Sequence, residues 1–531
     1  MFYSLIRLIV FIFCLLGVKT SLFTQKNFSK VYIGIEEHSS FGQTVREVNG
    51  EFMFASHLVE HGRLGSVSPA FTTIDGAGRE IYQKLISYQD TSVFISKPNS
   101  LNILDDSFYS YVIMNTPDID SLTHQSIGVL EVDPEGEVEL LFHFQDSDHL
   151  YGNSMVCTSD STLALYTSGA DTQSMYYNSV SILNIRTGES TTRSYQGGYR
   201  SIGMGDIRAL PDGELLLTFK TCQKEDLEFC RDIAVLQKIG ADGEIVWTYE
   251  SEESVKWSNN DQYPLALPLR NGDIALAWTL DTTVYNVGQE EWYDEGTATI
   301  FIIDENGNFK RETRITGRPL LMTNLELLTN GDILGMGMGA LFTQTDGVRD
   351  NGAFAFRTTS DGDVIWERAF VDLQATDLNN QIFEDGLETP SGDLLFVGSR
   401  LLRDLGESIA YRAWVVKLGA DGCFNPKNCG ENLELITETV VATTSASRDP
   451  SRLEVAPNPA SKQFSFSLPV SSTNSQRHFE LLDVNGRMVR SEKIAGNTHT
   501  VAANNLSEGA YIVRVRSDTE LFTAKVIVQK N

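Results

Sequence analysis

The chain has 531 residues, with 71 Asp and Glu against 42 Lys and Arg, which gives a formal net charge of −29. Such an excess of negative charge repels phosphate backbones and anionic membrane surfaces, so the composition argues against nucleic-acid binding. Hydrophobic residues make up 41% of the chain and aromatic residues 10%, which argues against a mostly disordered protein.

The N-terminus has the features of a secretory signal peptide, which we assign to residues 1–24. Arg7 is followed by an apolar run from Leu8 to Val18, which is too short for a membrane span of about 20 residues. A lipid anchor on Cys14 is not expected, because Phe13 rather than a small residue precedes it. No later apolar stretch approaches membrane-spanning length, so the mature chain is predicted to have no transmembrane segment.

Five cysteines remain after removal of this segment, in a chain predicted to meet oxidising conditions. Their short spacing predicts disulfides between Cys222 and Cys230 and between Cys423 and Cys429. A zinc site is the alternative, but neither pair has C-x2-C spacing and no His lies near either, so no metal is predicted. Cys157 is left over and is predicted to be a buried, inert thiol.

One sequence motif recurs between residues 40 and 430. Each copy has an apolar run, a turn of Asp-Gly or Asn-Gly type, and a second apolar run. The clearest copies have turn glycines separated by 59, 59 and 61 residues, at Gly213, Gly272, Gly331 and Gly392. Weaker copies upstream have turns at Gly50, Asp106 and Ser161. Together they make seven repeats, which is typical of a repeat architecture.

A second motif of the same kind alternates with the first. Its clear copies have turns at Gly243, Gly307, Gly362 and Gly422, and its weaker copies at Gly78, Gly136 and Gly188. Each motif predicts a β-hairpin, so each repeat contributes four strands. We therefore predict an all-β fold with a seven-bladed β-propeller over residues 25–430. A solenoid or a row of sandwiches is the alternative, but each repeat is too short for a sandwich and has no helical pattern.

The hairpin sequences resemble the short propeller repeats of secreted bacterial proteins, as in Ser391-Gly392-Asp393-Leu-Leu and Lys417-Leu-Gly-Ala-Asp-Gly422. This resemblance implies a fold and not an activity. The last repeat is incomplete, because Cys423 and Pro426 stand where its outer strand is expected. The segment from Lys30 to Ile35 has strand character and no partner of its own, so we predict that it supplies the missing strand.

The chain changes character after the repeats. Residues 431–452 are rich in Thr and Ser and are predicted to be a linker. Residues 453–531 contain several short apolar runs, one pair of which is joined by the turn Asn485-Gly486. These runs predict a small antiparallel β-sandwich.

This C-terminal segment resembles the type A sorting domain of cargo proteins of the Bacteroidota type IX secretion system. The matching residues occur in the order of that family, at Pro457, Asn458, Pro459, Gly486, Gly509, Tyr511 and Lys525. The resemblance implies passage through the outer membrane by the type IX machinery, removal of the tail, and release or attachment at the cell surface. An ordinary Ig-like binding domain is the alternative.

No common catalytic motif occurs in the sequence. His57, Glu60 and His61 follow a predicted strand rather than lying on a helix, so they do not form a zinc-protease motif, and no cofactor is predicted. Propeller geometry offers another guide: the residue seven before each first-motif turn should lie near the mouth of the central channel. These residues are Gln43, Asn99, Ser154, Asp206, Leu265, Asn324 and Asp385. Six of them are polar, which indicates either a ligand site or an ordinary solvated mouth.

Aromatic and acidic residues occur together in the longer connections, at Trp257, Trp292 and Tyr293. Such side chains stack on sugar rings or anchor a protein partner, although packing between blades explains them equally well. Our first hypothesis is therefore a non-catalytic binding or adhesive propeller that recognises a glycan or protein. The second is a polysaccharide hydrolase or lyase that uses Asp206 and Asp385 as acid and base. A structural surface-layer component is the third.

Overall fold

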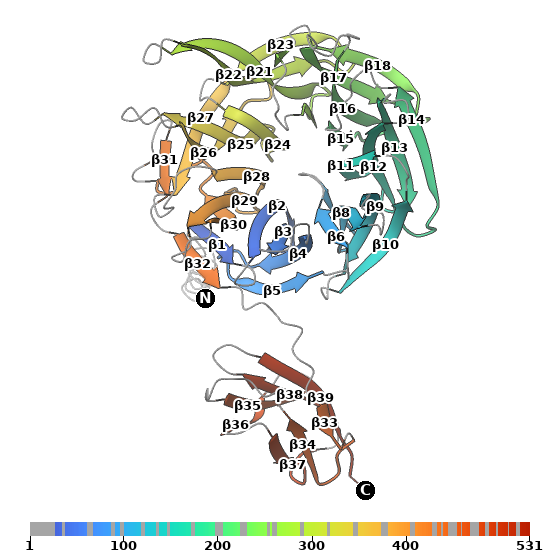
Figure 1. Cartoon of the computed structure of the whole chain (residues 1–531), viewed down its shortest axis with the longest axis vertical. Helices are drawn as coiled ribbons and strands as arrows, with labels where there is room; N and C mark the ends of the chain where they lie inside the picture. Colours follow the sequence, from blue (N-terminus) through green and yellow to red (C-terminus); the bar gives the residue numbers. More distant parts are fainter. Residues whose placement is uncertain are drawn as a thin grey trace, which may run out of the picture. The chain divides into compact units, whose positions relative to one another are not determined.

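Figure 1 shows the computed structural model of the chain, which divides into the units Met1–Thr443 and Thr444–Asn531. The structure describes residues 27–530 except for 34–37, 61–66, 87–90, 96–99, 118–122, 134–136, 146–148, 171–175, 197–204, 223–230, 252–254, 257–262, 287–290, 316–318, 343–348, 373–380, 404–408, 427–428, 430–432, 437–438, 444–453, 458, 468–476, 484–487, 495–497, 508 and 517–520. The predicted signal peptide lies outside the described residues. Among them, no helix is long and apolar enough to cross a membrane.

The described part of the first unit forms sheets of four or five strands, in chain order. The first sheet contains β2 (His38–Val48), β3 (Glu51–Glu60), β4 (Val67–Ile74) and β5 (Glu80–Leu85). The second contains β6 (Ser92–Ile95), β7 (Leu101–Leu104), β8 (Ser107–Pro117), β9 (Thr123–Val132) and β10 (Val138–Gln145). The third contains β11 (His149–Cys157), β12 (Thr162–Ala170), β13 (Tyr176–Asn184) and β14 (Ser190–Gln196).

Two further sheets repeat this pattern of antiparallel neighbours. The fourth contains β15 (Gly205–Ala209), β16 (Leu215–Cys222), β17 (Arg231–Ile239), β18 (Ile245–Glu250) and the short β19 (Val255–Lys256). The fifth contains β20 (Leu265–Pro268), β21 (Ile274–Asn286), β22 (Glu291–Ile303) and β23 (Phe309–Arg314).

The last two sheets include strands from distant parts of the chain. The sixth contains β24 (Pro319–Leu327), β25 (Ile333–Phe342), β26 (Arg349–Thr358), β27 (Val364–Asp372) and β31 (Leu433–Ile436). The seventh contains β28 (Gln381–Glu388), β29 (Leu394–Arg403), β30 (Ile409–Leu418), β1 (Phe28–Ile33) and β32 (Thr439–Thr443).

These sheets are arranged in a ring, with β2, β11, β15, β24 and β28 nearest its centre (Figure 1). The all-β class and the propeller fold are therefore confirmed. The described sheets of this unit agree in number with the expected seven blades, and the blade count for the whole chain stays a prediction. Glycines allow the tight hairpin turns, since Gly272 and Gly331 have φ angles of 87° and 90°.

Neighbouring sheets contact each other through one recurring arrangement. A side chain from the outer strand of one sheet lies over the turn glycine of the next sheet. Trp247 of β18 lies over Gly307, and Trp366 of β27 lies over Gly422. Because each of these glycines has no Cβ, the indole ring of the tryptophan can approach the turn closely. Where the turn glycine is described, the sheet is thereby fastened to its neighbour at the rim of the ring.

The N-terminal strand β1 closes this ring. It pairs antiparallel with β30 of the seventh sheet, where Val31 is opposite Trp414. Its Phe28 ring lies over Gly78 of the first sheet, and the hydroxyl of Tyr32 donates to the carbonyl of Gly78 at 2.8 Å. The prediction that this strand completes the last repeat is confirmed for residues 28–33, while Ile35 lies outside the described residues.

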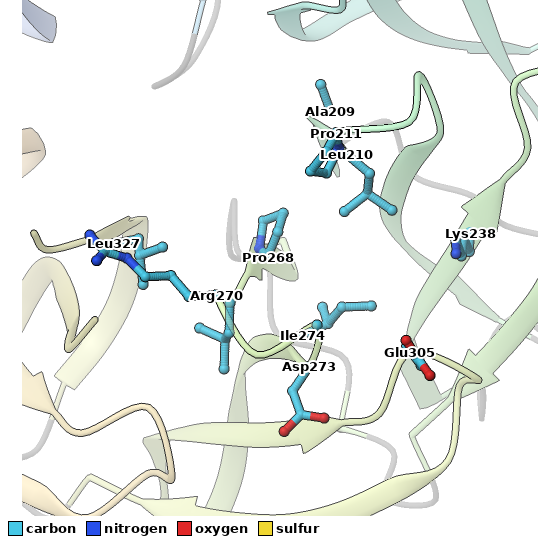
Figure 2. Close-up of a pocket in the computed structure, with 12 residues that line it drawn as sticks. Ala209, Leu210, Pro211, Lys238, Pro268, Arg270, Asp273, Ile274, Glu305 and Leu327 are labelled. Atoms are coloured by element: carbon cyan, nitrogen blue, oxygen red, sulfur yellow. The ribbon is translucent and has the colours of Figure 1, made fainter. Parts of the chain in front are cut away.

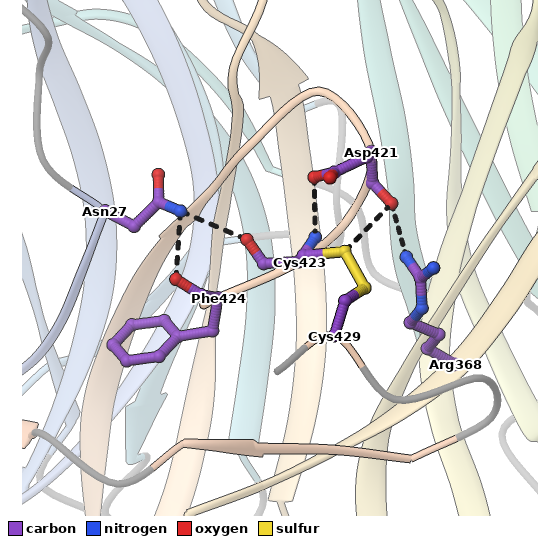
Figure 3. Close-up of a disulfide and its surroundings, with 6 residues drawn as sticks. All are labelled: Asn27, Arg368, Asp421, Cys423, Phe424 and Cys429. Atoms are coloured by element: carbon purple, nitrogen blue, oxygen red, sulfur yellow. Dashed lines mark hydrogen bonds between the residues drawn. A yellow bond between two sulfur atoms is a disulfide. The ribbon is translucent and has the colours of Figure 1, made fainter. Parts of the chain in front are cut away.

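A disulfide follows β30 at the place where the seventh sheet lacks an outer strand of its own. Cys423 and Cys429 are bonded, as predicted (Figure 3). The side chain of Asn27 donates to the carbonyls of Cys423 and Phe424 at 3.1 and 3.0 Å. The beginning of β1 is thus held against the disulfide loop, which joins the two ends of the propeller sequence.

The segment predicted as a linker contains two strands that belong to the propeller. β31 pairs parallel with β27, and β32 pairs parallel with the outer side of β1. The first unit accordingly ends at Thr443 rather than at residue 430. The Thr and Val residues of this segment favour extended backbone, and the edges of β27 and β1 offer unpaired backbone groups to it. Composition alone did not reveal that pairing.

Burial of the Tyr32 side chain, and then the negative charge of Glu80 on β5, raise the pKa of Tyr32, so Glu80 lies near the closing strand. Burial also raises the pKa of the Glu80 carboxyl itself to about 7. A carboxyl with a raised folded pKa contributes stability that is fully present below its unfolded pKa and is lost as the pH rises through about 7.

We therefore expect Glu80→Gln to be more stable than the native chain at pH 8 and equally stable at pH 4. The gain at pH 8 should be about 1 kcal/mol, because partial exposure screens the charge. Thermal unfolding at both pH values tests this, with the exposed Glu189→Gln as the control. An equal effect of Glu80→Gln at both pH values would contradict it.

The second unit is a small sandwich of two antiparallel sheets, as predicted for this segment. One sheet contains β33 (Glu454–Ala456), β34 (Gln463–Ser467) and β37 (Thr498–Ala502). The other contains β35 (Arg477–Asp483), β36 (Met488–Ile494), β38 (Gly509–Arg516) and β39 (Leu521–Val528). Phe464, Phe466 and Phe479 lie in its core, with Val513 and Val526.

Candidate functional site

The candidate site is a row of side chains on the strands nearest the centre of the ring. Each residue of the row is aligned, across the first hairpin of its sheet, with the residue five positions after the turn residue of the first motif. Examples are the pairs Asp206–Thr218 and Asp385–Val397, counted from Gly213 and Gly392. The row consists of Thr44, Ser100, Ser154, Asp206, Leu265, Asn324 and Asp385, and every member is at most 1% exposed. Four of the predicted residues, Ser154, Asp206, Asn324 and Asp385, therefore occupy equivalent positions.

Gln43 and Asn99 are not members of this row, and the reason is the length of their turns. The first hairpin closes with the two residues Asn49 and Gly50, whose φ angles are 56° and 84°. The second hairpin likewise closes with Asp105 and Asp106. The later sheets use a five-residue connection, so counting back seven residues overshoots by one in the first two sheets. Gln43 lies at a β-bulge, and Asn99 lies outside the described residues.

Asp385 on β28 accepts hydrogen bonds from two other strands, β2 and β24. Its Oδ2 accepts from the Thr44 hydroxyl at 2.7 Å and from Nη1 of Arg46 at 2.8 Å. The backbone N–H of Val45 also donates to this oxygen, at 3.0 Å. Its Oδ1 accepts from the side-chain amide of Asn324 at 2.5 Å. This carboxylate thus links the first, sixth and seventh sheets.

Asp206 holds a similar position between the third and fourth sheets. Its Oδ1 accepts from the Ser154 hydroxyl at 2.9 Å, and its Oδ2 accepts from Nε of Arg208 at 2.8 Å. Arg208 also donates through Nη2 to Oδ1 of Asn324 at 2.8 Å. Leu265 supplies no polar atom in the fifth sheet, so Arg208 reaches past it to the sixth. The two carboxylates therefore belong to one network, connected by Arg208 and Asn324.

Sequence reasoning missed Arg46 and Arg208, although a signal was present. Both arginines lie two residues after a member of the row and therefore point to the same side of their strands. Glu326 has the same relation to Asn324. Burial raises the pKa of Glu326, while the positive charges of Arg46 and Arg208 oppose this shift. Two guanidinium groups and one carboxyl group thus gather next to the row.

The other predicted residues give a mixed outcome. Trp257 lies outside the described residues. Trp292 and Tyr293 are aligned in β22 with Tyr285 and Val284 of β21, and their side chains lie outside the described part of the structure. These two residues therefore lie on the β21–β22 hairpin, and their role in ligand binding stays a prediction.

His57 and Cys157 lie in buried environments that favour their neutral forms. Burial lowers the pKa of His57 to about 4, and its Nε2 lies 2.9 Å from the carbonyl of Ile95. Burial raises the pKa of the free thiol Cys157 to about 11, as expected for an inert cysteine. The predicted Cys222–Cys230 bond is not tested, since Cys230 lies outside the described residues. Among those that are described, no group of three His, Cys, Asp or Glu side chains is arranged to hold a metal ion.

A separate pocket of about 380 Å³ lies between the first turns of the fourth and fifth sheets (Figure 2). Its lining includes Leu210 and Pro211 from one turn and Leu269 and Arg270 from the next. Lys238 also lines it and is already paired with Glu214, with Nζ and Oε2 2.7 Å apart. None of the residues predicted to bind a ligand lies in this lining.

The residues that suggested a sorting domain are partly described. Pro457 and Pro459 follow β33 and are exposed, whereas Tyr511 on β38 is buried and its hydroxyl donates to the carbonyl of Ser507 at 2.9 Å. Gly509 begins β38 and Lys525 lies in β39. Asn458 and Gly486 lie outside the described residues.

The comparison with protein families decides the nature of this unit. Residues 454–529 match the family described as the secretion system C-terminal sorting domain. The chain is a β-propeller protein with a type IX sorting domain. It is therefore exported to the cell surface or secreted, and the type IX machinery is its partner in export. No curated protein matches the chain.

Solved structures similar to this chain include several enzymes with low sequence identity. The phage phi92 endosialidase is 8% identical with a TM-score of 0.42, over 94% of this chain and 87% of that one. The GH93 α-L-arabinofuranosidase of Fusarium graminearum is 10% identical with a TM-score of 0.36, over 74% and 97%. The Synechocystis apocarotenoid oxygenase is 10% identical with a TM-score of 0.39, over 73% and 97%. With identities and TM-scores this low, we infer no activity from them.

Proposed function

We propose that the exported propeller is a binding module that recognises a glycan or a protein and does not cleave it. The observation that carries this proposal is the state of Asp206 and Asp385. Both are at most 1% exposed, and both of their carboxylate oxygens already accept hydrogen bonds. A general acid or base must exchange a proton with its substrate, so it needs an oxygen that the substrate can reach.

The network around these carboxylates supports a structural role for them. Arg46 and Arg208 neutralise their charges, and Thr44, Ser154 and Asn324 fix their positions. All of these contacts except the pair Arg208–Asp206, which lies within β15, join strands of different sheets, so the network holds the centre of the ring together. A rigid ring of this kind presents loops and rim surfaces to a ligand without a change of shape.

The proposed ligand contacts are the aromatic residues of the longer connections. Trp292 and Tyr293 lie on the long β21–β22 hairpin, and Trp257 lies in the segment before β20. Large aromatic side chains supply much of the binding energy at protein interfaces and stack on sugar rings. We therefore assign them, rather than the buried row, to ligand recognition.

Glu326 is the one observation that favours a hydrolase. It is half-buried, and its raised pKa would help it to hold a proton for a leaving group. Its partner in such a reaction would have to be a second reachable carboxyl, which neither Asp206 nor Asp385 supplies. The hydrolase is therefore our second candidate.

The test is a glycan array combined with product analysis on the purified mature chain. We expect binding without cleavage, and at least about a tenfold loss of affinity in Trp292→Ala or Tyr293→Ala. Ile81→Ala, which removes an exposed apolar side chain from β5, is the matched control. Cleavage that disappears in Glu326→Gln would replace this proposal with the hydrolase.

A further inference from the structure

The pocket between the first turns of the fourth and fifth sheets has a wall of aliphatic side chains. Leu210, Pro268 and Ile274 belong to this wall, and none of the described residues that line the pocket is aromatic. Its volume of about 380 Å³ lies in the range of ligand sites, which is about 300–1,000 Å³. Such a wall favours an aliphatic ligand group, because that group leaves water when it binds.

Four charged side chains also line the pocket, and two of them are already neutralised by the chain itself. Nζ of Lys238 lies 2.7 Å from Oε2 of Glu214. Oδ2 of Asp273 lies 2.7 Å from Nζ of Lys310. These two lining groups therefore need no charge from a ligand.

The other two charged side chains, Arg270 and Glu305, have no ion-pair partner among the described residues. Arg270 is exposed, and its Nη2 makes one hydrogen bond, to the carbonyl of Leu328 at 3.4 Å. Glu305 is also exposed, and its backbone carbonyl accepts from Nε1 of Trp247 at 3.0 Å. One free cation and one free anion thus line the same pocket.

These two free charges lie on different sides of the aliphatic wall. Figure 2 shows that Arg270 extends toward Leu327, whereas Glu305 lies on the side of Lys238. The contacts agree, since Arg270 donates to the sixth sheet and Glu305 is held by β18 of the fourth. A ligand that reaches both needs a negative group at one end, a positive group at the other and an apolar group between them.

The other repeats show that neither charge is needed for the turns. Uncharged residues take the position of Arg270 in the other clear copies of the first turn, namely Pro211, Thr329 and Pro390. Uncharged residues also take the position of Glu305 in the other clear copies of the second turn, namely Ala241, Ser360 and Ala420. All of these turns close with the same backbone hydrogen bond to their glycine. The two free charges are therefore a local departure from the repeat, and both occur at this pocket.

We propose that this pocket binds a small zwitterion with an aliphatic side chain, which is an amino acid or a short peptide. Its carboxylate contacts Arg270, whose guanidinium presents a planar fork to two oxygens, and its ammonium group contacts Glu305. Ile274 beside the pocket begins β21, whereas Trp292 is aligned near the other end of that strand. The inference therefore goes beyond the proposed function and does not rest on it.

The test is isothermal titration calorimetry of the purified mature chain with leucyl-leucine and with L-leucine. We expect binding at one site per chain, and the tighter of the two ligands assigns the pocket to peptides or to free amino acids. The N-acetylated and the C-terminally amidated forms of that ligand each lose one charge and should bind at least about tenfold more weakly. Glycyl-glycine, which has no aliphatic side chain, should also bind at least about tenfold more weakly.

Arg270→Thr and Glu305→Ala test the two contacts separately. Arg270→Thr should weaken the zwitterion at least about tenfold and leave the amidated form unchanged, because that form has no carboxylate. Glu305→Ala should likewise weaken the zwitterion and leave the N-acetylated form unchanged. Arg186→Thr is the matched control, since Arg186 is a 57% exposed arginine of the third sheet.

Two results would overturn the proposed pocket ligand. One is the absence of binding by both zwitterions, and the other is equal binding by the native chain and by both pocket variants. The comparison of the zwitterion with its acetylated and amidated forms uses the native chain, so it gives a result even if a variant does not fold. Binding of a glycan on the array would still support the proposed function in either case.

Discussion

Deletion of residues 25–33 is expected to lower the melting temperature of the whole propeller by about 5 °C or more. The deletion removes Val31 and Tyr32, which are 0% and 2% exposed. Burial of each such side chain contributes about 1.5–3 kcal/mol, and each kcal/mol corresponds to about 1 °C in a unit of this size. It also leaves β30 and β32 without the strand that lies between them. Differential scanning calorimetry of the purified chain measures the shift.

The form of the transition matters as much as its midpoint. Because β1 also fastens the seventh sheet to the first through Gly78, the loss should affect all the sheets in one cooperative transition. Ile81→Ala is the control, since its side chain is 48% exposed and its loss should change stability by less than about 0.5 kcal/mol. A local loss confined to one sheet, with an unchanged main transition, would show that ring closure does not depend on β1.

Asp385→Ala is expected to destabilise the propeller by about 3–5 kcal/mol. The substitution removes the acceptor of Thr44, Arg46 and Asn324 at once, and it leaves the guanidinium of Arg46 without the carboxylate that neutralises it. Removal of one partner of a buried ion pair costs more than the pair contributes, because the other charge stays in a poorly solvated position. Urea unfolding measures the change.

Asp363→Ala is the matched control for this effect. Asp363 also pairs with an arginine, Arg311, but the two side chains are 66% and 46% exposed. Exposed ion pairs contribute about 0–1 kcal/mol, so this variant should stay close to the native chain. If both substitutions had the same small effect, the central network would not hold the ring together.

The repeat architecture could be predicted because local sequence determines it. An Asp-Gly or Asn-Gly turn between two apolar runs specifies a hairpin without reference to the rest of the chain. The strand at residues 28–33 could be predicted for a different reason: the last repeat visibly lacks an outer strand, and an unpaired edge needs a partner. The first argument uses only residues that lie close together in sequence. The second uses a missing strand, which comparison with the other repeats reveals.

The central network could be predicted only in part, because its contacts depend on register. Asp206 and Asp385 were found by counting from the turns, but Thr44 and Ser100 were missed, since the first two turns are shorter than the others. The hydrogen bond from Arg208 to Asn324, which passes Leu265, joins residues more than 100 positions apart. It therefore depends on the closed ring. The parallel pairing of β31 and β32 likewise depends on edges that exist only after the sheets have formed.

The central claim is that this exported propeller binds its ligand and leaves it intact. The most direct measurement is mass spectrometry of a glycan ligand recovered after prolonged incubation with the mature chain at pH 5, 7 and 9. We expect an unchanged ligand mass at every pH, together with retention of the ligand on the protein. Recovery of shorter oligosaccharides that are not formed by Glu326→Gln would contradict the account and identify the propeller as a hydrolase or lyase.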